Sequence, residues 1–389
     1  MYFLIFRWLQ TGGVETLTLR EGEWLKKNKG DVCIITQIIS DDMRRLYKKL
    51  GVDVVVLNKW NAKEIHNAVI LKKQVIDLMQ MYDLGDFLKY KCHYPNHNVK
   101  IIYYCVHPIS DCFFKSSRIG KKLFIHFFSD AISKFNKNKN ILYMDEETLT
   151  ANLDNYNLEH ERGYFSTCPL PFKIHEQNMH ERSKDVFRIL TVSRVDFPYK
   201  GYLLGLIDVL NNNFEELSEF ELTIITHGNY QVLIDKINSM NEKLKERIVF
   251  IDHVTPDKLP EYYQSADLYV GMGTTVLEAS DYGVTSVVAQ YDTYEFVSTG
   301  LFKDNPLDLG SKVSEGISGI EYIKNVAGLT DSDYERIQND TKKALKDNYD
   351  EDIILEKIDG WQCYDIERLS VISNLFFKLY FQLKDWKFR

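Results

Sequence analysis

Short runs of β-branched and aromatic residues recur along the chain, separated by longer segments that mix polar and apolar positions. Most of these runs are apolar throughout rather than alternating, which is typical of strands buried on both faces of a parallel sheet. The runs are residues 2–6, 31–36, 52–57 and 99–106 in the first half, and 187–193, 220–226, 247–254, 267–270 and 286–289 in the second half.

The segments between the runs have helical patterns. Residues 62–82 and 231–244 carry apolar side chains at helical spacing, and Thr255-Pro256 fits a helix N-cap followed by proline in the first turn. Strands alternating with helices over the whole length predict an α/β fold with two doubly wound, Rossmann-like units. We expect a first domain over 1–172, a second over 185–365, and a last helix over 366–389 that packs back on the first domain.

Composition narrows the class of protein. A length of 389 residues favours two domains, and the formal net charge of −8 argues against a dedicated nucleic-acid binder. No apolar run reaches the roughly 18 residues of a spanning helix, and the run at residues 2–6 is too short for a signal peptide core. The six cysteines form no C-x-x-C pair, so we expect reduced thiols in a cytoplasmic protein without a bound metal.

One segment, residues 269–283, predicts an anion site. A buried strand enters a turn with Gly271 and Gly273, and a helix then starts near Thr274. The free N–H groups of Thr274 and Thr275 can bind a phosphate, and Glu278 on the same helix can accept hydrogen bonds from sugar or ribose hydroxyls. A tight strand–helix turn with a solvated glutamate is the simpler alternative.

A second segment, residues 190–201, has the same layout. Its strand ends in a polar loop that carries Arg194 and Lys200, six residues apart. Two cations at the carboxyl end of a strand can converge on a diphosphate, because open α/β sheets bind their ligands at that edge. The alternative is two unrelated cations on a surface loop.

Together these segments resemble the retaining GT-B glycosyltransferases of the family-4 type. The first match is Ser193-Arg194 with Lys200-Gly201, and the second is Glu278-Ala279 followed by the helix end at Gly283. Further matches are looser: the glycine loop Thr11-Gly12-Gly13, a strand-end histidine, His107, the turn at His227-Gly228, and the strand that ends in Val254.

This resemblance implies a GT-B fold, with two Rossmann-like domains facing a cleft: an acceptor-side domain over 1–172 and a nucleotide-sugar-binding domain over 185–365. It also implies roles for the matched residues. The donor would be a nucleotide-diphosphate sugar such as a UDP-sugar, bound as substrate without a further cofactor and transferred with retention and without a metal. Catalytic roles fall to His107, Arg194 and Lys200. Donor contacts fall to Gly12, Gly13, His227, Val254, Gly273, Thr274, Thr275 and Glu278.

The chain departs from the family at one position. The family has a second glutamate eight residues before the one at 278, where this chain has Val270. Either other groups contact a different sugar here, or the protein is a non-catalytic GT-B-like subunit that binds a glycan or stabilises a partner transferase. A nucleotide-sugar epimerase is a weaker alternative, because the extra acidic residues that it needs are not identified.

Residues 113–139 combine phenylalanines with seven Lys and Arg residues and a single acid, Asp130. Such a segment is typical of a helix on an anionic membrane surface, and a core-packed helix with a basic face is the alternative. We expect a glycan or lipid-linked acceptor in surface polysaccharide or glycoconjugate synthesis, with peripheral attachment at the inner face of the plasma membrane. No nucleic-acid partner is expected.

Overall fold

The computed structural model describes residues 1–389 except 11–12, 73–74, 96–98, 107–117, 176–178, 180–181, 184, 218, 227, 253, 256–257, 312–315, 365–368 and 388–389. The chain forms two compact units. Unit 1 contains Met1–Lys173 and Glu351–Arg389, and unit 2 contains Ile174–Asp350. Unit 1 is therefore built from both ends of the chain, and the chain returns to it at residue 351 rather than at the expected residue 366.

Unit 1 has a sheet of six parallel strands. Its strands are apolar throughout because both faces are buried: Phe3 and Ile5 enter one core, whereas Tyr2 and Leu4 enter the other. In order across the sheet, the strands are β5 (Asp53–Val56), β3 (Val32–Thr36), β1 (Tyr2–Ile5), β6 (Leu78–Met81), β7 (Ile101–Cys105) and β8 (Ile141–Tyr143), and a separate pair is formed by β2 (Trp8–Leu9) and β4 (Ile38–Ile39).

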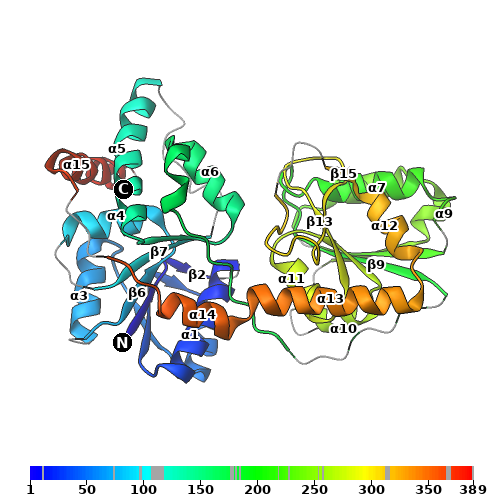
Figure 1. The fold of residues 1–389 in the computed structure, drawn as a ribbon, viewed down its shortest axis with the longest axis horizontal. Helices are drawn as coiled ribbons and strands as arrows, with labels where there is room; N and C mark the ends of the chain where they lie inside the picture. Colours follow the sequence, from blue (N-terminus) through cyan, green and yellow to red (C-terminus); the bar gives the residue numbers. More distant parts are fainter. Residues whose placement is uncertain are drawn as a thin grey trace. The chain divides into compact units, whose positions relative to one another are not determined.

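Helices cover both faces of this sheet (Figure 1). One face packs against α1 (Gly13–Asn28), α2 (Asp41–Lys49) and α14 (Glu351–Asp359). The other face packs against α3 (Ala62–Lys72), α4 (Leu84–His93), α5 (Arg118–Lys137), α6 (Glu146–Tyr156) and α15 (Val371–Lys387).

The last two helices belong to the hydrophobic cores of unit 1. Ile354, Leu355 and Ile358 of α14 are buried beside α1, which explains why the chain rejoins this unit before residue 366. In α15, Phe377 is fully buried and packs edge-on against Phe128 of α5, with ring centroids 4.9 Å apart.

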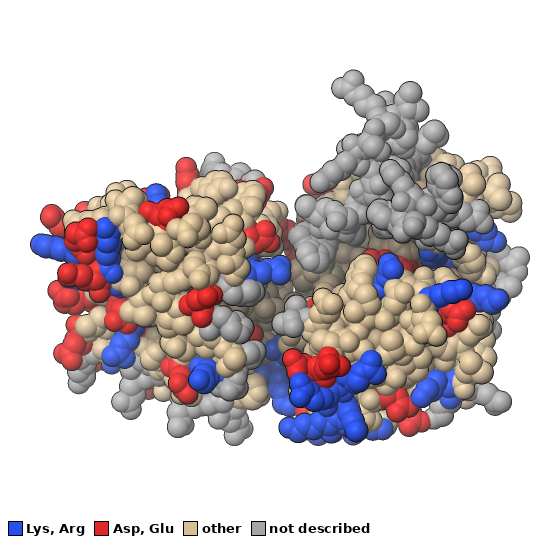
Figure 2. Space-filling view, turned by 180° about the vertical axis from the view of Figure 1, so that it is seen from behind, with Lys and Arg blue, Asp and Glu red and all other residues tan. Residues whose placement is uncertain are grey.

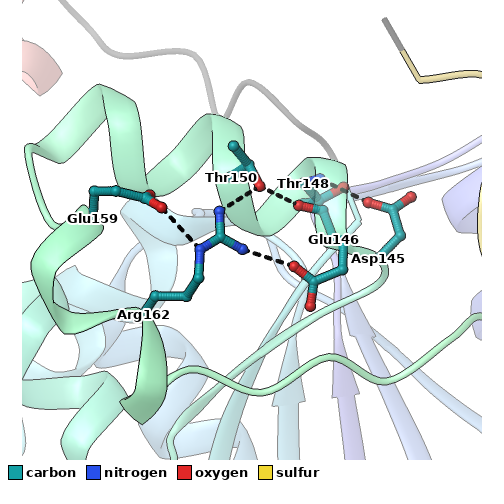
Figure 3. A network of polar contacts seen from close by, with 6 residues as sticks. All are labelled: Asp145, Glu146, Thr148, Thr150, Glu159 and Arg162. Carbon is teal, nitrogen blue, oxygen red and sulfur yellow. Dashed lines mark hydrogen bonds and ion pairs between the residues drawn. The ribbon is translucent and has the colours of Figure 1, made fainter. Parts of the chain in front are cut away.

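A polar network joins α6 to the following 3-10 helix, η1 (Glu159–Tyr164) (Figure 3). Asp145 caps α6 by accepting a 2.7 Å hydrogen bond from the Thr148 amide. Arg162 of η1 donates to Glu146, Thr150 and Glu159 at 2.8–2.9 Å. The network fixes η1 on α6 just before the chain leaves unit 1, although each exposed ion pair contributes only about 0–1 kcal/mol.

Unit 2 has a seven-stranded sheet. In order across it, the strands are β11 (Ile248–Asp252), β10 (Phe220–Thr226), β9 (Phe187–Val192), β12 (Leu268–Gly271), β13 (Thr285–Ala289), β14 (Val297–Leu301) and β15 (Ile317–Ser318). The first five are parallel, and β14 and β15 run antiparallel at one edge.

The helices of unit 2 also form two layers. In Figure 1, α7 (Tyr202–Asn212) and α12 (Gly319–Ala327) lie on one face of the sheet. The opposite face carries α10 (Leu259–Ser265), α11 (Thr274–Asp281) and α13 (Asp331–Tyr349). The short helices α8 (Gln231–Asn238) and α9 (Glu242–Lys245) connect β10 to β11.

All nine strands expected from the apolar runs are present, whereas three helix predictions were wrong in detail. Residues 62–82 are not one helix, because α3 ends at Lys72 and the fully buried strand β6 follows. The segment 231–244 is broken into α8 and α9, and α10 begins at Leu259, with Pro260 in its first turn, instead of after Thr255. Pro256 lies outside the described residues.

Candidate functional site

The carboxyl ends of the parallel strands of unit 2 bring the two predicted segments together. The chain leaves β9 toward β10 on one side, whereas β12 leads to β13 on the other side. Neighbouring strands whose connections diverge in this way leave a crevice at their carboxyl ends, which is where open α/β sheets bind ligands. Arg194 follows β9 and the start of α11 follows β12, so both predicted segments lie at this crevice.

Arg194 and Lys200 are electrostatically coupled cations. Neither pairs with a carboxylate that the structure describes. Burial and, to a lesser extent, the positive charge of Arg194 lower the pKa of Lys200 to about 8, although the negative charge of Asp196 opposes the shift. A half-buried ammonium beside an exposed guanidinium is electrostatically unfavourable on its own, and a bound anion would relieve that repulsion.

Close packing fixes the loop that carries Lys200. A Cβ atom on Gly201 would lie 2.4 Å from the Thr293 carbonyl oxygen, and one on Gly205 would lie 2.3 Å from the Phe296 amide nitrogen. The Asp292 amide also donates a 3.0 Å hydrogen bond to the Tyr199 carbonyl. The glycines therefore allow the start of α7 to contact the loop after β13, which holds Lys200 in place.

The turn that leads into the N-terminus of α11 is fixed by neighbouring residues. Gly273 precedes the helix at a positive φ of 73°, a conformation that favours glycine. The Tyr269 hydroxyl hydrogen bonds to Thr275 Oγ1 at 2.6 Å and to the Val192 carbonyl at 3.2 Å, so it ties β9 to α11. The Tyr269 ring lies over Gly271, where a Cβ atom would be 2.4 Å from its hydroxyl oxygen.

Glu278 lies on the second turn of α11 and is half-buried. The Tyr263 hydroxyl donates a 3.0 Å hydrogen bond to Glu278 Oε2. Burial and the negative charge of Glu278 raise the pKa of Tyr263, so this tyrosine stays a hydrogen-bond donor. The contact fixes the direction of the carboxylate. The contact of Glu278 with a ribose stays a prediction.

Val270, where the family has a glutamate, lies inside β12, is 0% exposed and belongs to the core of unit 2. Valine suits that buried position. Whether other groups contact a different sugar here or the protein is a non-catalytic subunit stays open between the two predicted alternatives.

The other predicted donor residues are only partly described. Val254 follows β11, at the same edge of the sheet, and Gly13 begins α1 in unit 1 with open space around it. Gly12, His107 and His227 lie outside the described residues. Their predicted roles, and those of Val254 and Gly13, stay predictions.

Polar residues that the sequence reasoning missed lie at the corresponding edge of unit 1. Trp60 Nε1 donates a 2.8 Å hydrogen bond to Asp86 Oδ2, and the Asp86 amide donates to Asp83 Oδ1 at 2.8 Å. Arg7 follows β1 at the same edge. Had residues 78–81 been recognised as a strand, Asp83 would have been recognised as a strand-end residue.

Some expectations concern the described chain as a whole. The five cysteines that the structure describes are free thiols, and Cys112 lies outside those residues. No helix in the described ranges combines the length and apolarity needed to cross a bilayer. No group of three or more His, Cys, Asp or Glu residues that could hold a metal ion occurs among the described side chains.

Comparison with known proteins finds a similarity in unit 2. Residues 186–315 match the family described as "Glycosyl transferases group 1", a stretch that contains Arg194, Lys200 and Glu278. No curated protein matches the chain at a significant level of sequence similarity.

Solved structures place the whole chain in the GT-B fold, with two Rossmann-like domains. Anabaena HepE in complex with UDP has a TM-score of 0.66 at 14% identity, covering 92% of this chain and 98% of that one. A glycosyltransferase from Rickettsia africae has a TM-score of 0.61 at 15% identity, covering 92% and 96%. WaaG, a glycosyltransferase involved in lipopolysaccharide biosynthesis, has a TM-score of 0.58 at 13% identity, covering 92% and 97%.

Proposed function

We propose that the protein transfers a sugar from a nucleotide-diphosphate donor to a hydroxyl acceptor. The observation that carries the proposal is the pair Arg194 and Lys200, which forms no ion pair with a described carboxylate, at the edge of the sheet where α11 also begins. Two cations and the amides of a helix N-terminus match the charge and the hydrogen-bond acceptors of a diphosphate. The match of residues 186–315 to a glycosyltransferase family supports the same reaction.

The donor, the stereochemical outcome and the acceptor are proposed from similarity to known glycosyltransferases. HepE has been solved with UDP and with UDP-glucose, which supports a UDP-sugar as the donor. We propose retention of configuration and charge stabilisation of the leaving diphosphate by Arg194, Lys200 and the α11 dipole instead of a metal. WaaG supports an acceptor in surface polysaccharide or glycoconjugate synthesis. His107, Gly12, Gly13, His227 and Val254 remain proposed contacts.

The donor site is tested by calorimetric titration of UDP into the full chain. Arg194→Ala and Lys200→Ala should each weaken binding by roughly 10- to 100-fold, because each removes a charged hydrogen-bond donor. Arg188→Ala is the matched control, since Arg188 is an exposed cation near the other end of β9. Equal affinities in the wild type and both site variants would refute the assignment.

Peripheral membrane contact is also a proposal, but a different observation from the one in the sequence now supports it. In the described part of residues 113–139, Phe128, Ile132 and Phe135 are buried in the core of unit 1, as the core-packed alternative expects. Residues 113–117 lie outside the described part. The observation that now supports membrane contact is the uneven distribution of charge between the two units.

Unit 1 contains 31 Lys and Arg against 26 Asp and Glu, a formal charge of +5, whereas unit 2 contains 17 against 30, a formal charge of −13. Figure 2 shows Lys and Arg gathered along one edge of unit 1. Exposed cations of unit 1 include Lys26 and Lys27 in the last turn of α1, and Arg44, Lys48 and Lys49 on α2. Such clusters favour anionic lipid surfaces.

Liposome sedimentation tests this contact. Vesicles with an anionic lipid should pellet the full chain at low salt, and 0.5 M salt should release it, because exposed charges are screened. Arg44→Glu with Lys48→Glu should reduce pelleting more than Lys236→Glu with Lys243→Glu in unit 2. Equal pelleting with neutral and anionic vesicles would contradict the proposal.

A further inference from the structure

The helix α11 carries a buried carboxylate at its C-terminal end. Asp281 is the last residue of this helix and is only 2% exposed. A carboxylate is unfavourable there, because the C-terminus is the negative end of the helix dipole and burial removes the water that would solvate the charge. A small apolar residue would suit the position better, so the carboxylate needs a specific partner that offsets this cost.

That partner is His175, which lies 106 positions earlier in the chain. The His175 amide donates a 3.0 Å hydrogen bond to Asp281 Oδ1, and His175 Nδ1 donates to Asp281 Oδ2 at 2.7 Å. The carboxylate oxygens only accept, so the contact places a ring proton on Nδ1. Among the side chains that the structure describes, no other one forms a hydrogen bond or an ion pair with this carboxylate.

The segment that begins with His175 is attached to unit 2 at further points. The chain enters this unit one residue before His175. Arg182 Nη1 then donates to the Leu329 carbonyl at 2.6 Å, and the Ser183 amide donates to Asp267 Oδ1 at 3.0 Å. His175 is therefore held on the same unit as α11, and it can anchor that helix.

The opposite end of α11 is the part that lies at the candidate donor site. Gly273 has no side chain to cap this end, so the amides of Thr274 and Thr275 stay available to an anion. The helix has eight residues, which makes it a short rod of about 12 Å. A change of direction at its C-terminal end therefore moves the N-terminal amides and the Glu278 carboxylate together.

We propose that His175 is a positioning residue for the nucleotide-diphosphate donor. Its contact with Asp281 fixes the C-terminal end of α11 and thereby the direction in which the N-terminal amides point toward the diphosphate. The inference rests on the proposed function, because it requires the donor to bind at this helix. His175 acts through α11 rather than by touching the donor, since Asp281 and the donor-binding amides lie at opposite ends of the helix.

A contact that only stabilises unit 2 is the alternative. Removing such a contact would lower the melting temperature, but it would leave the UDP affinity of the folded protein unchanged. Positioning predicts a lower affinity even where every variant is folded, because a displacement of about 1 Å is enough to impair contacts with a ligand. Melting temperature and UDP affinity, measured on the same variants, therefore distinguish the two roles.

Calorimetric titration of UDP into the full chain tests the proposal. His175→Ala should weaken UDP binding by roughly five- to tenfold, because α11 loses its anchor. His175→Asn should restore the affinity to within about twofold of wild type, since its amide nitrogen takes the place of Nδ1 and can donate to Asp281. Wild-type affinity in His175→Ala, or no recovery in His175→Asn, would overturn the proposal.

Two controls accompany these variants. Thr330→Ala removes the side-chain cap of α13, a 3.2 Å hydrogen bond from the Asp333 amide, and so destabilises the same unit without changing the contact of His175. His160→Ala removes an exposed histidine of η1 in unit 1. Both should bind UDP as the wild type does. A loss in Thr330→Ala as large as in His175→Ala would attribute the effect to general destabilisation and refute positioning.

A double variant separates affinity from stability directly. His175→Ala combined with Asp281→Ala removes the buried charge together with its partner, so the melting temperature should return toward that of the wild type. The UDP affinity should stay as weak as in His175→Ala, because the anchor is still missing. Recovery of both quantities would show that the contact is purely structural.

Arg194→Ala separates this inference from the function on which it rests. Weak UDP binding in Arg194→Ala with wild-type binding in His175→Ala would refute the positioning role and leave the donor site intact. Unchanged UDP binding in both Arg194→Ala and Lys200→Ala would refute the donor site itself.

Discussion

Replacing one buried carboxyl group should change how the stability of unit 1 depends on pH. Glu21 on α1 is 1% exposed, and Gln80 Nε2 donates to its two oxygens at 3.1 and 3.0 Å. The Tyr82 hydroxyl also donates to it. Burial nevertheless raises the pKa of Glu21 from 4.5 to about 8, because the hydrogen bonds only partly offset the lost solvation. The folded protein therefore holds a proton there at neutral pH.

The sign and size of the effect follow from linkage. Between pH 4.5 and 8, the folded state keeps the proton of Glu21 and the unfolded state releases it, so stability falls as the pH rises. The free energy of unfolding falls by about 1.4 kcal/mol per pH unit, or about 5 kcal/mol over the full interval. This destabilisation is complete above pH 8 and absent below pH 4.5. Glu21→Gln removes the ionisation and should remove this slope.

Tryptophan fluorescence in urea is a suitable assay, because all five tryptophans lie in unit 1 and none lies in Ile174–Asp350. The signal therefore follows unit 1 alone. From pH 5.5 to 7.5, the stability of Glu21→Gln relative to wild type should rise by about 3 kcal/mol. Glu23→Gln, at a half-buried position on the same helix where the carboxylate pairs with Lys173, should show no such trend. A difference for Glu21→Gln that is constant with pH would refute the reasoning.

The remaining predictions concern unit 2. Because the pKa of Lys200 is about 8, its charge is lost as the pH rises through that value, and UDP affinity should fall above pH 8 by up to about tenfold per pH unit. Calorimetry at pH 7, 8 and 9 would show this, and Lys200→Arg should flatten the profile; a flat wild-type profile would contradict a role for Lys200 in binding. Gly201→Ala should destabilise unit 2 by about 1–3 kcal/mol, since its Cβ would meet the Thr293 carbonyl oxygen at 2.4 Å. Gly13→Ala, whose Cβ would meet nothing within 4 Å, is the control in thermal unfolding, and equal melting temperatures would count against the packing argument. Tyr263→Phe removes the 3.0 Å hydrogen bond to Glu278 and should raise the dissociation constant for UDP several-fold, whereas Tyr262→Phe should leave it unchanged. An unchanged dissociation constant in both variants would argue against a role for Glu278 in donor binding.

Apolar runs predicted the strands well because strands buried on both faces tolerate few polar residues. They failed for β6 because Leu78–Met81 follows α3 with apolar side chains that also fit helical spacing. Sequence alone does not show that the backbone changes conformation between Lys72 and Leu78. The helix after Gly273 was predicted correctly, since glycines mark both of its ends.

The sequence indicated those parts of the candidate site whose charged residues lie close together in one loop, as Arg194 and Lys200 do. The pKa of Lys200 is lowered mainly by burial, which the sequence does not report. Arg7, Trp60 and Asp86 were missed because they are separated by up to 79 positions in the chain and come to one edge only through the strand order of unit 1.

The return of α14 and α15 to unit 1 has a consequence for the order of folding during synthesis. Unit 2 is one continuous stretch, Ile174–Asp350, and can fold as soon as it leaves the ribosome. The first 173 residues leave earlier but lack Leu355, Ile358 and Phe377, which belong to their cores. Unit 1 is therefore the first to be synthesised but the last to complete its fold. Its apolar core residues stay exposed on the ribosome while unit 2 folds.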